Sequence, residues 1–370
     1  MKIAVLGAGA MGLSTVALLA ARGHAPRLWS PSGRSTEGFG ARVAITASGA
    51  LVGTWEVDVA HDIASALDGV DAVVLAVDAG GHAAVMAAAV PYLRAGVPFI
   101  IGAAHSMSGV YLSGLVAARG ISLPIVSWNT TVGTAHKTGP RTVDIRTLRP
   151  RIEAAVMPSG QAEAVLAQCA DLFGAQFEQR GDALVIALLS NANPVFHVPV
   201  CLLNISRIER QEDWAPYGQT SPAVGRLMEA LDAERIALAA AFGHEIHSVN
   251  AHFHRSFRIP LGTMADMNAT LHAAGRGPRG PKSVTHRYLA QDLSYGLVFA
   301  STLGECAGVA MPVHDATVTL ASAALAHDYR ADNDLMRRLD LTGLSKAEIL
   351  RRASQGLFET GADQSTKRMS

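Results

Sequence analysis

The chain contains few cysteines and no excess of either charge. Its 370 residues include three cysteines, and they lie far apart in apolar stretches, at Cys169, Cys201 and Cys306. This spacing favours buried, reduced thiols over a disulfide framework or a cysteine-based metal site. Lys+Arg and Asp+Glu both number 31, so the formal net charge is zero. Because nucleic-acid-binding proteins normally show a basic excess or stripe, we expect no nucleic-acid partner.

Long hydrophobic runs are also missing. Gly, Asp or His interrupts each apolar stretch before it reaches the ~20 residues that a membrane span needs. Residues 1–6 begin like a signal peptide, but a glycine-rich turn follows at once. We therefore expect a cytoplasmic protein without a membrane partner. With 49% hydrophobic and 17% charged residues the composition is globular, and the length suits two domains.

The first half of the chain alternates between strand-like and helix-like segments. An apolar helix is expected at residues 13–22, directly after the glycine-rich turn. Short apolar runs bounded by Gly, Pro or Asp predict strands at residues 2–6, 26–30, 73–77, 98–102 and 124–128. This alternation predicts a Rossmann domain over residues 1–185, with a doubly wound and mainly parallel sheet.

The second half has a different pattern. From Asn191 onward the strand-like runs disappear, and helical patterns cover residues 194–208, 222–241, 288–307 and 311–326. We predict an all-α domain over residues 186–360. The polar residues 361–370 are expected to form a flexible tail.

A glycine motif opens the first domain. GAGAMG at residues 7–12 fits G-x-G-x-x-G, and it lies between the first strand and the first helix, as a dinucleotide site requires. The helix N-terminus would then offer free N–H groups to the phosphates. The residues predicted to contact the cofactor here are Gly7, Gly9, Ala10, Met11, Gly12, and Val77 at the end of the third parallel strand.

The turn after the second strand bears on the choice of cofactor. NAD enzymes usually carry an acidic residue here, which binds the ribose 2′-hydroxyl. This turn instead offers hydroxyls and a guanidinium, which suit a 2′-phosphate, at Ser30, Ser32, Arg34 and Ser35. We therefore expect NADP in preference to NAD, although an ordinary polar turn would look the same.

Two polar clusters lie within the apolar helical domain. In the first, Asn193 is a predicted N-cap, and His197 lies about one turn into the helix. In the second, Asp292 follows Arg287 in an otherwise apolar helix. His197 by itself is compatible with a core histidine, and Asp292 with a residue that favours the helix dipole. The alternative is a catalytic histidine held by a carboxylate.

Three segments resemble the octopine/nopaline dehydrogenase family. They are NPVFHVPVCLLN at residues 193–204, HRYLAQDLSYGLV at residues 286–298, and the turn LWSPSGRST at residues 28–36. This family uses NAD(P)H to condense the amine of an L-amino acid with a 2-oxo acid, such as pyruvate or 2-oxoglutarate, through an imine to a secondary amine dicarboxylate.

The resemblance also implies roles for single residues. His197 matches the catalytic histidine and Asp292 its partner, which we expect to raise the pKa of the imidazole. Asn193 matches an asparagine beside the substrate, and Arg287 is a candidate clamp for a substrate carboxylate. Two aromatic residues are candidates for the amino-acid pocket and equally for the core, Trp214 and Tyr217.

Other functions stay open. A ketopantoate-reductase-like enzyme, acting on a 2-oxo acid or a preformed imine, would use a catalytic lysine, and before the tail region the helical domain offers only Lys282. An NADP-sensing protein without activity would not need His197 and Asp292 to meet. The histidines of residues 244–254 lack H-E-x-x-H spacing, so no metal is expected. A homodimer and a monomer are both compatible with the sequence.

Overall fold

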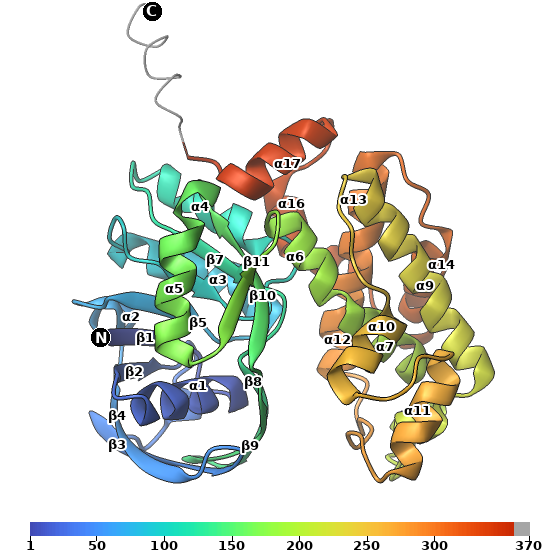
Figure 1. Ribbon diagram of the computed structural model, residues 1–370, viewed down its shortest axis with the longest axis horizontal. Helices are drawn as coiled ribbons and strands as arrows, with labels where there is room; N and C mark the ends of the chain where they lie inside the picture. The colour runs from blue at the N-terminus through green and yellow to red at the C-terminus, as the bar shows by residue number, and fades with distance from the viewer. Residues whose placement is uncertain (359–370) are drawn as a thin grey trace, which may run out of the picture. The chain divides into compact units, whose positions relative to one another are not determined.

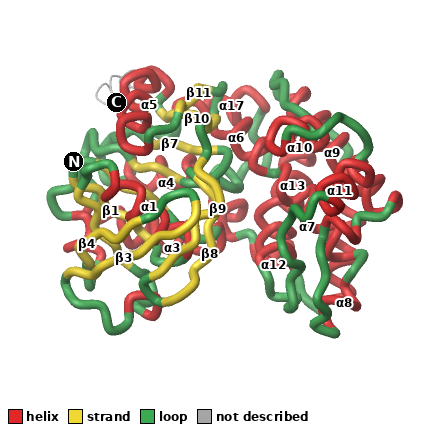
Figure 2. Tube along the Cα trace, turned by 60° about the horizontal axis from the view of Figure 1, so that its bottom comes forward, coloured by secondary structure: helices red, strands yellow, loops and turns green. Residues whose placement is uncertain are grey.

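The protein is divided into two compact units. The structure is a computed structural model that describes residues 1–358. One unit comprises Met1–Ile186 together with the described residues from Leu350 onward, and the other comprises Ala187–Ile349. The first contains a sheet covered by helices and the second consists of helices (Figures 1 and 2).

The C-terminal end of the chain differs from the expected domain organisation. The helical domain was expected to extend to residue 360, whereas the residues from Leu350 onward group with the first unit. The physical reason is contact between segments far apart in the sequence: Leu357 N donates to Ser113 Oγ at 2.9 Å, and Gln355 Nε2 donates to Ser159 Oγ at 2.9 Å. The predicted tail at residues 361–370 lies outside the described residues.

The first unit is built on an 11-stranded sheet in the order β11-β10-β7-β6-β5-β1-β2-β4-β3-β9-β8. Antiparallel pairs occur at β3–β4, β8–β9 and β7–β10, and the other neighbours are parallel. The predicted Rossmann fold with a mainly parallel sheet is therefore confirmed. The strands are β1 Lys2–Leu6, β2 Ala25–Trp29, β3 Arg42–Gly49, β4 Gly53–Val59, β5 Ala72–Leu75, β6 Phe99–Ile101, β7 Ile125–Trp128, β8 Gly133–Gly139, β9 Thr142–Leu148, β10 Arg151–Met157 and β11 Gln176–Gln179.

Helices cover both faces of this sheet, which explains why β5 is buried along its whole length. Helices α1 and α5 pack on one face and α2, α3 and α4 on the other (Figure 1). These helices are α1 Ala10–Ala21, α2 Ile63–Leu67, α3 Ala79–Ala89, α4 Ser108–Ala117 and α5 Ala162–Phe173. Near the C-terminal end, α17 Lys346–Gln355 begins in the second unit and ends in the first. Short 3₁₀ turns are η1 Arg34–Thr36, η2 Val90–Tyr92 and η3 Ser159–Gln161.

The second unit is entirely helical within the described residues, and an apolar core of helix faces holds it together. One segment, Asp292–Val298, is a π-helix that joins α12 to α13. The other helices are α6 Ala183–Ser190, which begins in the first unit, α7 Ala192–Leu202, α8 Ile205–Glu209, α9 Pro222–Ala241, α10 Val249–Phe257, α11 Met264–Ala273, α12 Arg287–Gln291, α13 Phe299–Ala307, α14 Pro312–Leu325, α15 Tyr329–Asp332 and α16 Asp334–Leu339, with a 3₁₀ turn η4 at Tyr217–Gln219.

The longest apolar helical run corrects two expectations. Ala183–Leu202, formed by α6 and α7, is long and apolar enough to cross a membrane by length and composition. Its residues are almost all buried inside the protein, which is typical of a core helix. Within this run α7 begins at Ala192 with Asn191 as its N-cap, so Asn193 is the second residue of the helix instead of the cap.

A buried ion pair connects three helices of the second unit. Arg235 is fully buried, and its guanidinium donates to Asp232 Oδ1 at 2.9 and 2.7 Å. It also donates to the carbonyls of Leu188 and His247, at 2.9 and 2.7 Å. Asp232 Oδ2 in turn accepts from Val249 N at 2.8 Å, at the start of α10. Both charged groups are thus hydrogen-bonded, as buried ions must be.

We predict that Arg235→Met destabilises the helical unit by about 3–5 kcal/mol, because Asp232 is left as a buried charge without its partner. Urea unfolding monitored by circular dichroism measures the loss. The control is Arg207→Met, which removes a half-exposed ion pair with Glu212 and should cost at most about 1 kcal/mol. Equal stability of the two variants would contradict this account.

Candidate active site

The second unit brings His197 and Asp292 into direct contact. His197 on α7 and Asp292 at the start of the π-helix form a hydrogen bond of 2.7 Å between Nδ1 and Oδ2. The two side chains are only 10% and 2% exposed. A buried carboxylate requires such a partner, so each residue stabilises the other in place. The two residues that the sequence predicted as a pair therefore do meet.

The π-helix holds Asp292 in a fully buried segment. Its wider turn disrupts the usual helical hydrogen bonds, and π-helical segments are frequent at functional sites. Two buried amide side chains bond to carbonyls of the segment: Asn191 Nδ2 donates to Gly296 O at 3.0 Å, and Asn333 Nδ2 donates to Ser294 O at 2.9 Å. The sequence reasoning missed both asparagines, because neither forms a local motif with the segment that it supports.

Gly296 fits the π-helix against α7. A Cβ on this glycine would lie 2.3 Å from Pro194 Cγ, so no other residue permits this close packing. Pro194 lies one turn before His197, so the contact sets the distance between the helix that carries the imidazole and the segment that carries the carboxylate.

Tyr288 is the second neighbour of the imidazole. Its ring stacks on His197 with centroids 3.6 Å apart and an interplanar angle of 13°. The hydrogen bond to Asp292 and this stack together restrict the rotation of the ring. Tyr288 lies in the HRY segment but was not predicted as a site residue. Its position four residues before Asp292 on a predicted helix was the available signal.

The surroundings of His197 determine its protonation. Burial lowers the pKa of His197 below its ordinary value, the hydrogen bond and charge of Asp292 act in the opposite direction, and the charge of Arg287 lowers it. Asp292 therefore raises the pKa as expected, but burial has the largest effect and the net direction is downward. The neutral ring then donates from Nδ1 to Asp292, so Nε2 carries a lone pair that can accept a proton.

Four residues of the helical unit were predicted as substrate contacts, and that role stays a prediction. Asn193 and Arg287 are exposed, and the Arg287 guanidinium lies 5.4 Å from the centre of the Tyr288 ring. Trp214 is buried, and its Nε1 donates to Pro281 O at 3.0 Å. Tyr217 is also buried and belongs to an aromatic cluster with Phe196, Phe253 and Phe257.

The glycine loop of the first unit has the shape of a dinucleotide site. Gly7 has φ +129°, and a Cβ there would lie 2.3 Å from Ala76 O and 2.9 Å from Val77 Cγ1. A Cβ on Gly12 would lie 1.9 Å from Gly7 O, whereas a Cβ on Gly9 would meet nothing within 4 Å. Gly7 and Gly12 are therefore required by the fold, and Gly9 leaves open space for a ligand.

The start of α1 completes this loop. Gly9 is the N-cap and no side chain caps the helix, so Ala10 and Met11 in the first turn leave their N–H groups available. These features fit the pyrophosphate of a nicotinamide dinucleotide, which supplies hydride chemistry when bound.

The predicted adenosine residues follow β2. Ser30 is buried, while Ser32 and Arg34 are exposed. Gly33, with φ +70°, turns the chain into η1, which includes Arg34 and Ser35. No hydrogen bond or ion pair occupies the Arg34 guanidinium within the described residues. Its contact with a 2′-phosphate stays a prediction.

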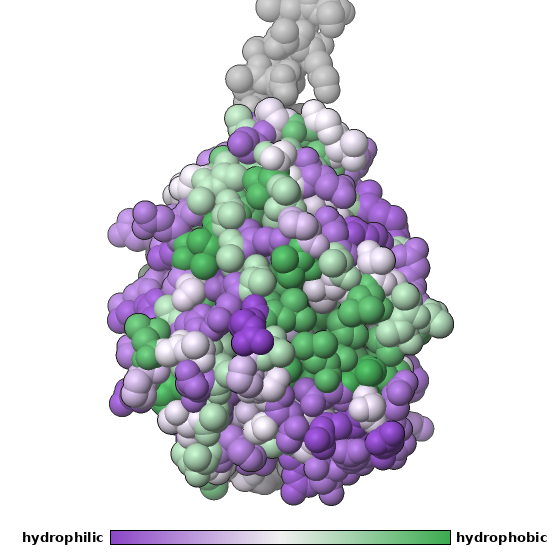
Figure 3. Space-filling view, turned by 90° about the vertical axis from the view of Figure 1, so that its right-hand side faces the viewer, coloured by the Kyte–Doolittle hydropathy of each residue, from purple (hydrophilic) through white to green (hydrophobic). Residues whose placement is uncertain are grey.

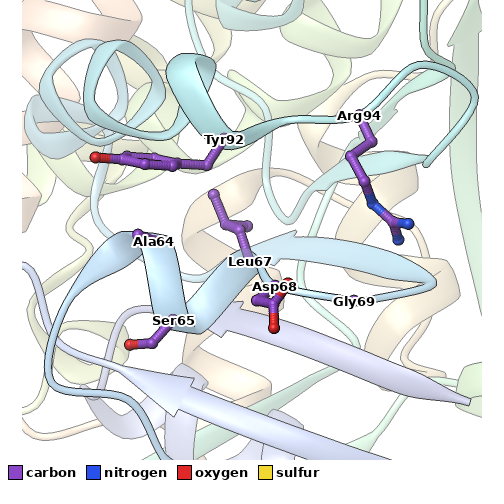
Figure 4. A pocket seen from close by; sticks show the side chains of 7 residues that line it. All are labelled: Ala64, Ser65, Leu67, Asp68, Gly69, Tyr92 and Arg94. Atoms are coloured by element: carbon purple, nitrogen blue, oxygen red, sulfur yellow. The ribbon is translucent and has the colours of Figure 1, made fainter.

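A shallow depression elsewhere on the first unit carries no comparable chemistry (Figure 4). It lies around the residues just before β5 and β6, at the amino edge of the sheet, whereas the glycine loop follows the carboxyl end of β1. Arg94 donates to the Val70 carbonyl, and Arg27 donates to Asp68 O at 3.0 Å. These groups hold the loop together, so we assign no ligand to it.

The histidines of residues 244–254 serve local contacts. The rings of His247 and His252 stack at 5.8 Å, and His254 Nδ1 bonds to Ile259 O at 2.6 Å. Within residues 1–358, no group of three or more metal-ligating side chains is arranged to hold a metal ion.

Comparisons with known proteins agree with this arrangement. Residues 180–325 match the family model "NAD/NADP octopine/nopaline dehydrogenase, alpha-helical domain", and residues 2–105 match "NAD-dependent glycerol-3-phosphate dehydrogenase N-terminus". Opine dehydrogenase from Arthrobacter sp. (strain 1C) is 29% identical over 350 residues, which is 94% of this chain and 97% of the relative.

Solved structures share the fold over almost the whole chain. Octopine dehydrogenase with NADH and L-arginine aligns with a TM-score of 0.77 at 18% identity, covering 95% of this chain and 98% of the other. Yersinopine dehydrogenase with NADP⁺ aligns with a TM-score of 0.69 at 16% identity, covering 95% and 97%.

The fold and these matches define an NAD(P)-dependent oxidoreductase with a Rossmann domain and a helical domain. Residues 180–325 match the helical-domain model of the octopine/nopaline dehydrogenase family, which agrees with the resemblance of residues 193–204 and 286–298 to that family.

We predict that Asp292→Asn lowers the pKa of His197 further, because both effects of the carboxylate that raise it are lost. NMR titration of ¹³C-histidine-labelled protein measures the change, with His197→Gln used to assign the signal. A pKa that rises in Asp292→Asn would show that the hydrogen bond does not stabilise the imidazolium.

The glycine loop permits a separation of fold from ligand binding. Gly9→Ala should leave the thermal unfolding midpoint unchanged, because its Cβ enters only open space. It should weaken NAD(P)⁺ binding about tenfold or more, because the pyrophosphate would approach the backbone through that space. Gly12→Ala should lower the midpoint itself, since its Cβ meets Gly7 O. Calorimetry measures binding and unfolding. If Gly9→Ala bound both dinucleotides normally, the loop would not be their site.

Proposed function

We propose that the protein is an opine dehydrogenase, acting on CH–NH groups, that condenses an L-amino acid with a 2-oxo acid such as pyruvate or 2-oxoglutarate and reduces the resulting imine with NAD(P)H. The observation that carries this proposal is the buried His197–Asp292 pair, with Nε2 left to accept a proton. It lies in a domain of the octopine/nopaline dehydrogenase family.

The lowered pKa of His197 suits the first step. An amino acid enters as an ammonium ion, which must lose a proton before its nitrogen can attack a carbonyl carbon. Neutral His197 accepts that proton at Nε2, and Asp292 stabilises the resulting imidazolium. The free amine then adds to the 2-oxo acid, and the new C–N bond gives a carbinolamine.

The same proton serves the next step. The imidazolium returns it to the carbinolamine hydroxyl, which leaves as water while the C=N bond forms. A nicotinamide dinucleotide, when bound, would supply the hydride for the imine carbon. In the reverse oxidation His197 accepts the proton of the secondary amine. One histidine with an adjustable charge is therefore sufficient for the proton transfers.

Exposed polar side chains near the pair would bind the substrates. Arg287, beside the Tyr288 ring, is our candidate for a bidentate contact with a substrate carboxylate. Asn193 on α7 is the candidate to bind the second polar group of the substrate. The turn after β2 has hydroxyls and Arg34 in place of an acid, so we propose NADP as the preferred cofactor. A cytoplasmic enzyme fits this cofactor.

The competing functions have less support. A lysine-dependent reductase would need Lys282, but its Nζ forms an ion pair of 2.6 Å with Asp213, and the two side chains are 50% and 83% exposed. A sensor without activity has no need for a buried His–Asp pair with a free Nε2.

We predict that NADPH is oxidised, with loss of absorbance at 340 nm, only when a 2-oxo acid and an L-amino acid are both present. His197→Gln should reduce turnover about 10²–10⁴-fold, the usual contribution of general acid–base catalysis. The control is His254→Gln, a histidine of the same unit that bonds to a backbone carbonyl. Oxidation with the oxo acid alone would replace the proposal with a simple 2-oxo acid reductase.

Homodimer formation stays a prediction. Apolar side chains gather on the face that carries α9 and α14 (Figure 3), and Leu320 on α14 is 56% exposed. Apolar surface of this kind often marks a protein–protein contact. Sedimentation of the wild type and Leu320→Glu distinguishes a dimer through this face from a monomer.

A further inference from the structure

Lys137 lies between the two loops that form the dinucleotide site of the first unit. Its Nζ donates to Ala8 O in the glycine loop at 3.3 Å and to Ser35 O in the turn after β2 at 3.5 Å. The first loop serves the pyrophosphate and the second the adenosine ribose. This ammonium group is therefore held near the edge of the ribose where a 2′-phosphate would be attached.

The hairpin formed by β8 and β9 carries Lys137 to this position. Strand β8 packs against α1, and its pairing with β9 shifts between Lys137 and Gly139. Such bulges redirect side chains. At the hairpin turn Arg141 donates to Gly38 O at 3.1 Å and stacks over Phe39 at 5.2 Å. The hairpin therefore contacts the segment that follows β2 at two points, through Lys137 and through Arg141.

The charges around this position are suited to a phosphate. Lys137 and Arg34 form no ion pair within the described part of the chain, and residues 30–36 contain no acid. Lys137 is exposed, and the carbonyls of Ala8 and Ser35 do not neutralise its positive charge. An anion with several acceptor oxygens would neutralise this charge through a charge-assisted hydrogen bond. A ribose hydroxyl gains much less from the same contact.

We propose that Lys137 is the residue that selects 2′-phosphorylated dinucleotides, with Arg34 as the second cation of the same phosphate site. This proposal rests on the proposed NAD(P)-dependent function. It assigns the preference for NADP to a residue on the β8–β9 hairpin, more than 100 positions after the turn that it complements.

Calorimetry with nucleotide fragments tests this without catalysis. The ligands are 2′,5′-ADP and 5′-ADP, which differ by the 2′-phosphate, followed by NADP⁺ and NAD⁺. Lys137→Met should raise the Kd for 2′,5′-ADP and NADP⁺ about tenfold to a hundredfold, the range of one charged hydrogen bond. The Kd for 5′-ADP and NAD⁺ should change less than about threefold, and Lys137→Arg should recover most of the loss.

Lys2→Met is the matched control, because Lys2 is an exposed lysine at the start of β1, at the opposite edge of the sheet from the glycine loop. It should leave every Kd unchanged. If Lys137→Met raised the Kd of all four ligands equally, the proposal would be overturned, and a contact of Lys137 with the pyrophosphate would be indicated. If the unfolding midpoint also fell, the role of Lys137 would be purely structural. Unchanged binding, or a wild type that prefers 5′-ADP, would overturn it as well.

The binding measurements distinguish failure of this assignment from failure of the proposed function. A wild type that binds 2′,5′-ADP in preference to 5′-ADP, and loses this preference in Lys137→Met, supports the assignment even if no pair of substrates is condensed. In that case the opine dehydrogenase activity would be wrong and the phosphate site correct.

Discussion

The candidate active site of the helical unit depends on the hydrogen bond between His197 and Asp292. A carboxylate that is 2% exposed is costly to bury unless a partner compensates its charge. The partner here is an imidazole whose own burial favours the neutral form. The two opposing effects keep one proton on Nδ1 and one lone pair on Nε2. The same contact thus stabilises the core and leaves a reactive nitrogen.

This pair depends on an irregular segment of helix. The π-helix holds Asp292 in the core, and the asparagine side chains that bond to its carbonyls come from the N-cap of α7 and from the α15–α16 junction. Because Gly296 has no side chain, Pro194 of α7 can pack directly against the π-helix. Local departure from α-helical geometry therefore contributes directly to the position of the carboxylate.

The first unit achieves its function by different means. Its dinucleotide loop depends on the absence of side chains at Gly7, Gly9 and Gly12 and on the free N–H groups at the start of α1. In our proposal, positive charge is added at the periphery of this loop by Arg34 and Lys137. The shape of the backbone thus defines the class of ligand, a dinucleotide. A few positively charged side chains can then determine whether NAD or NADP binds more tightly, without any change in the fold.

The sequence by itself determined the features that depend on local pattern. The buried parallel strands appear as apolar runs, and G-x-G-x-x-G is a contiguous motif. The signature segments place His197 and Asp292 within short stretches. Tertiary structure decided the rest. Strands β8 and β9 contain few buried residues and form no apolar run, so the hairpin that carries Lys137 gives no local signal. The stack of Tyr288, the π-helix and the grouping of the residues from Leu350 onward with the first unit depend on packing between distant segments, which local periodicity does not encode.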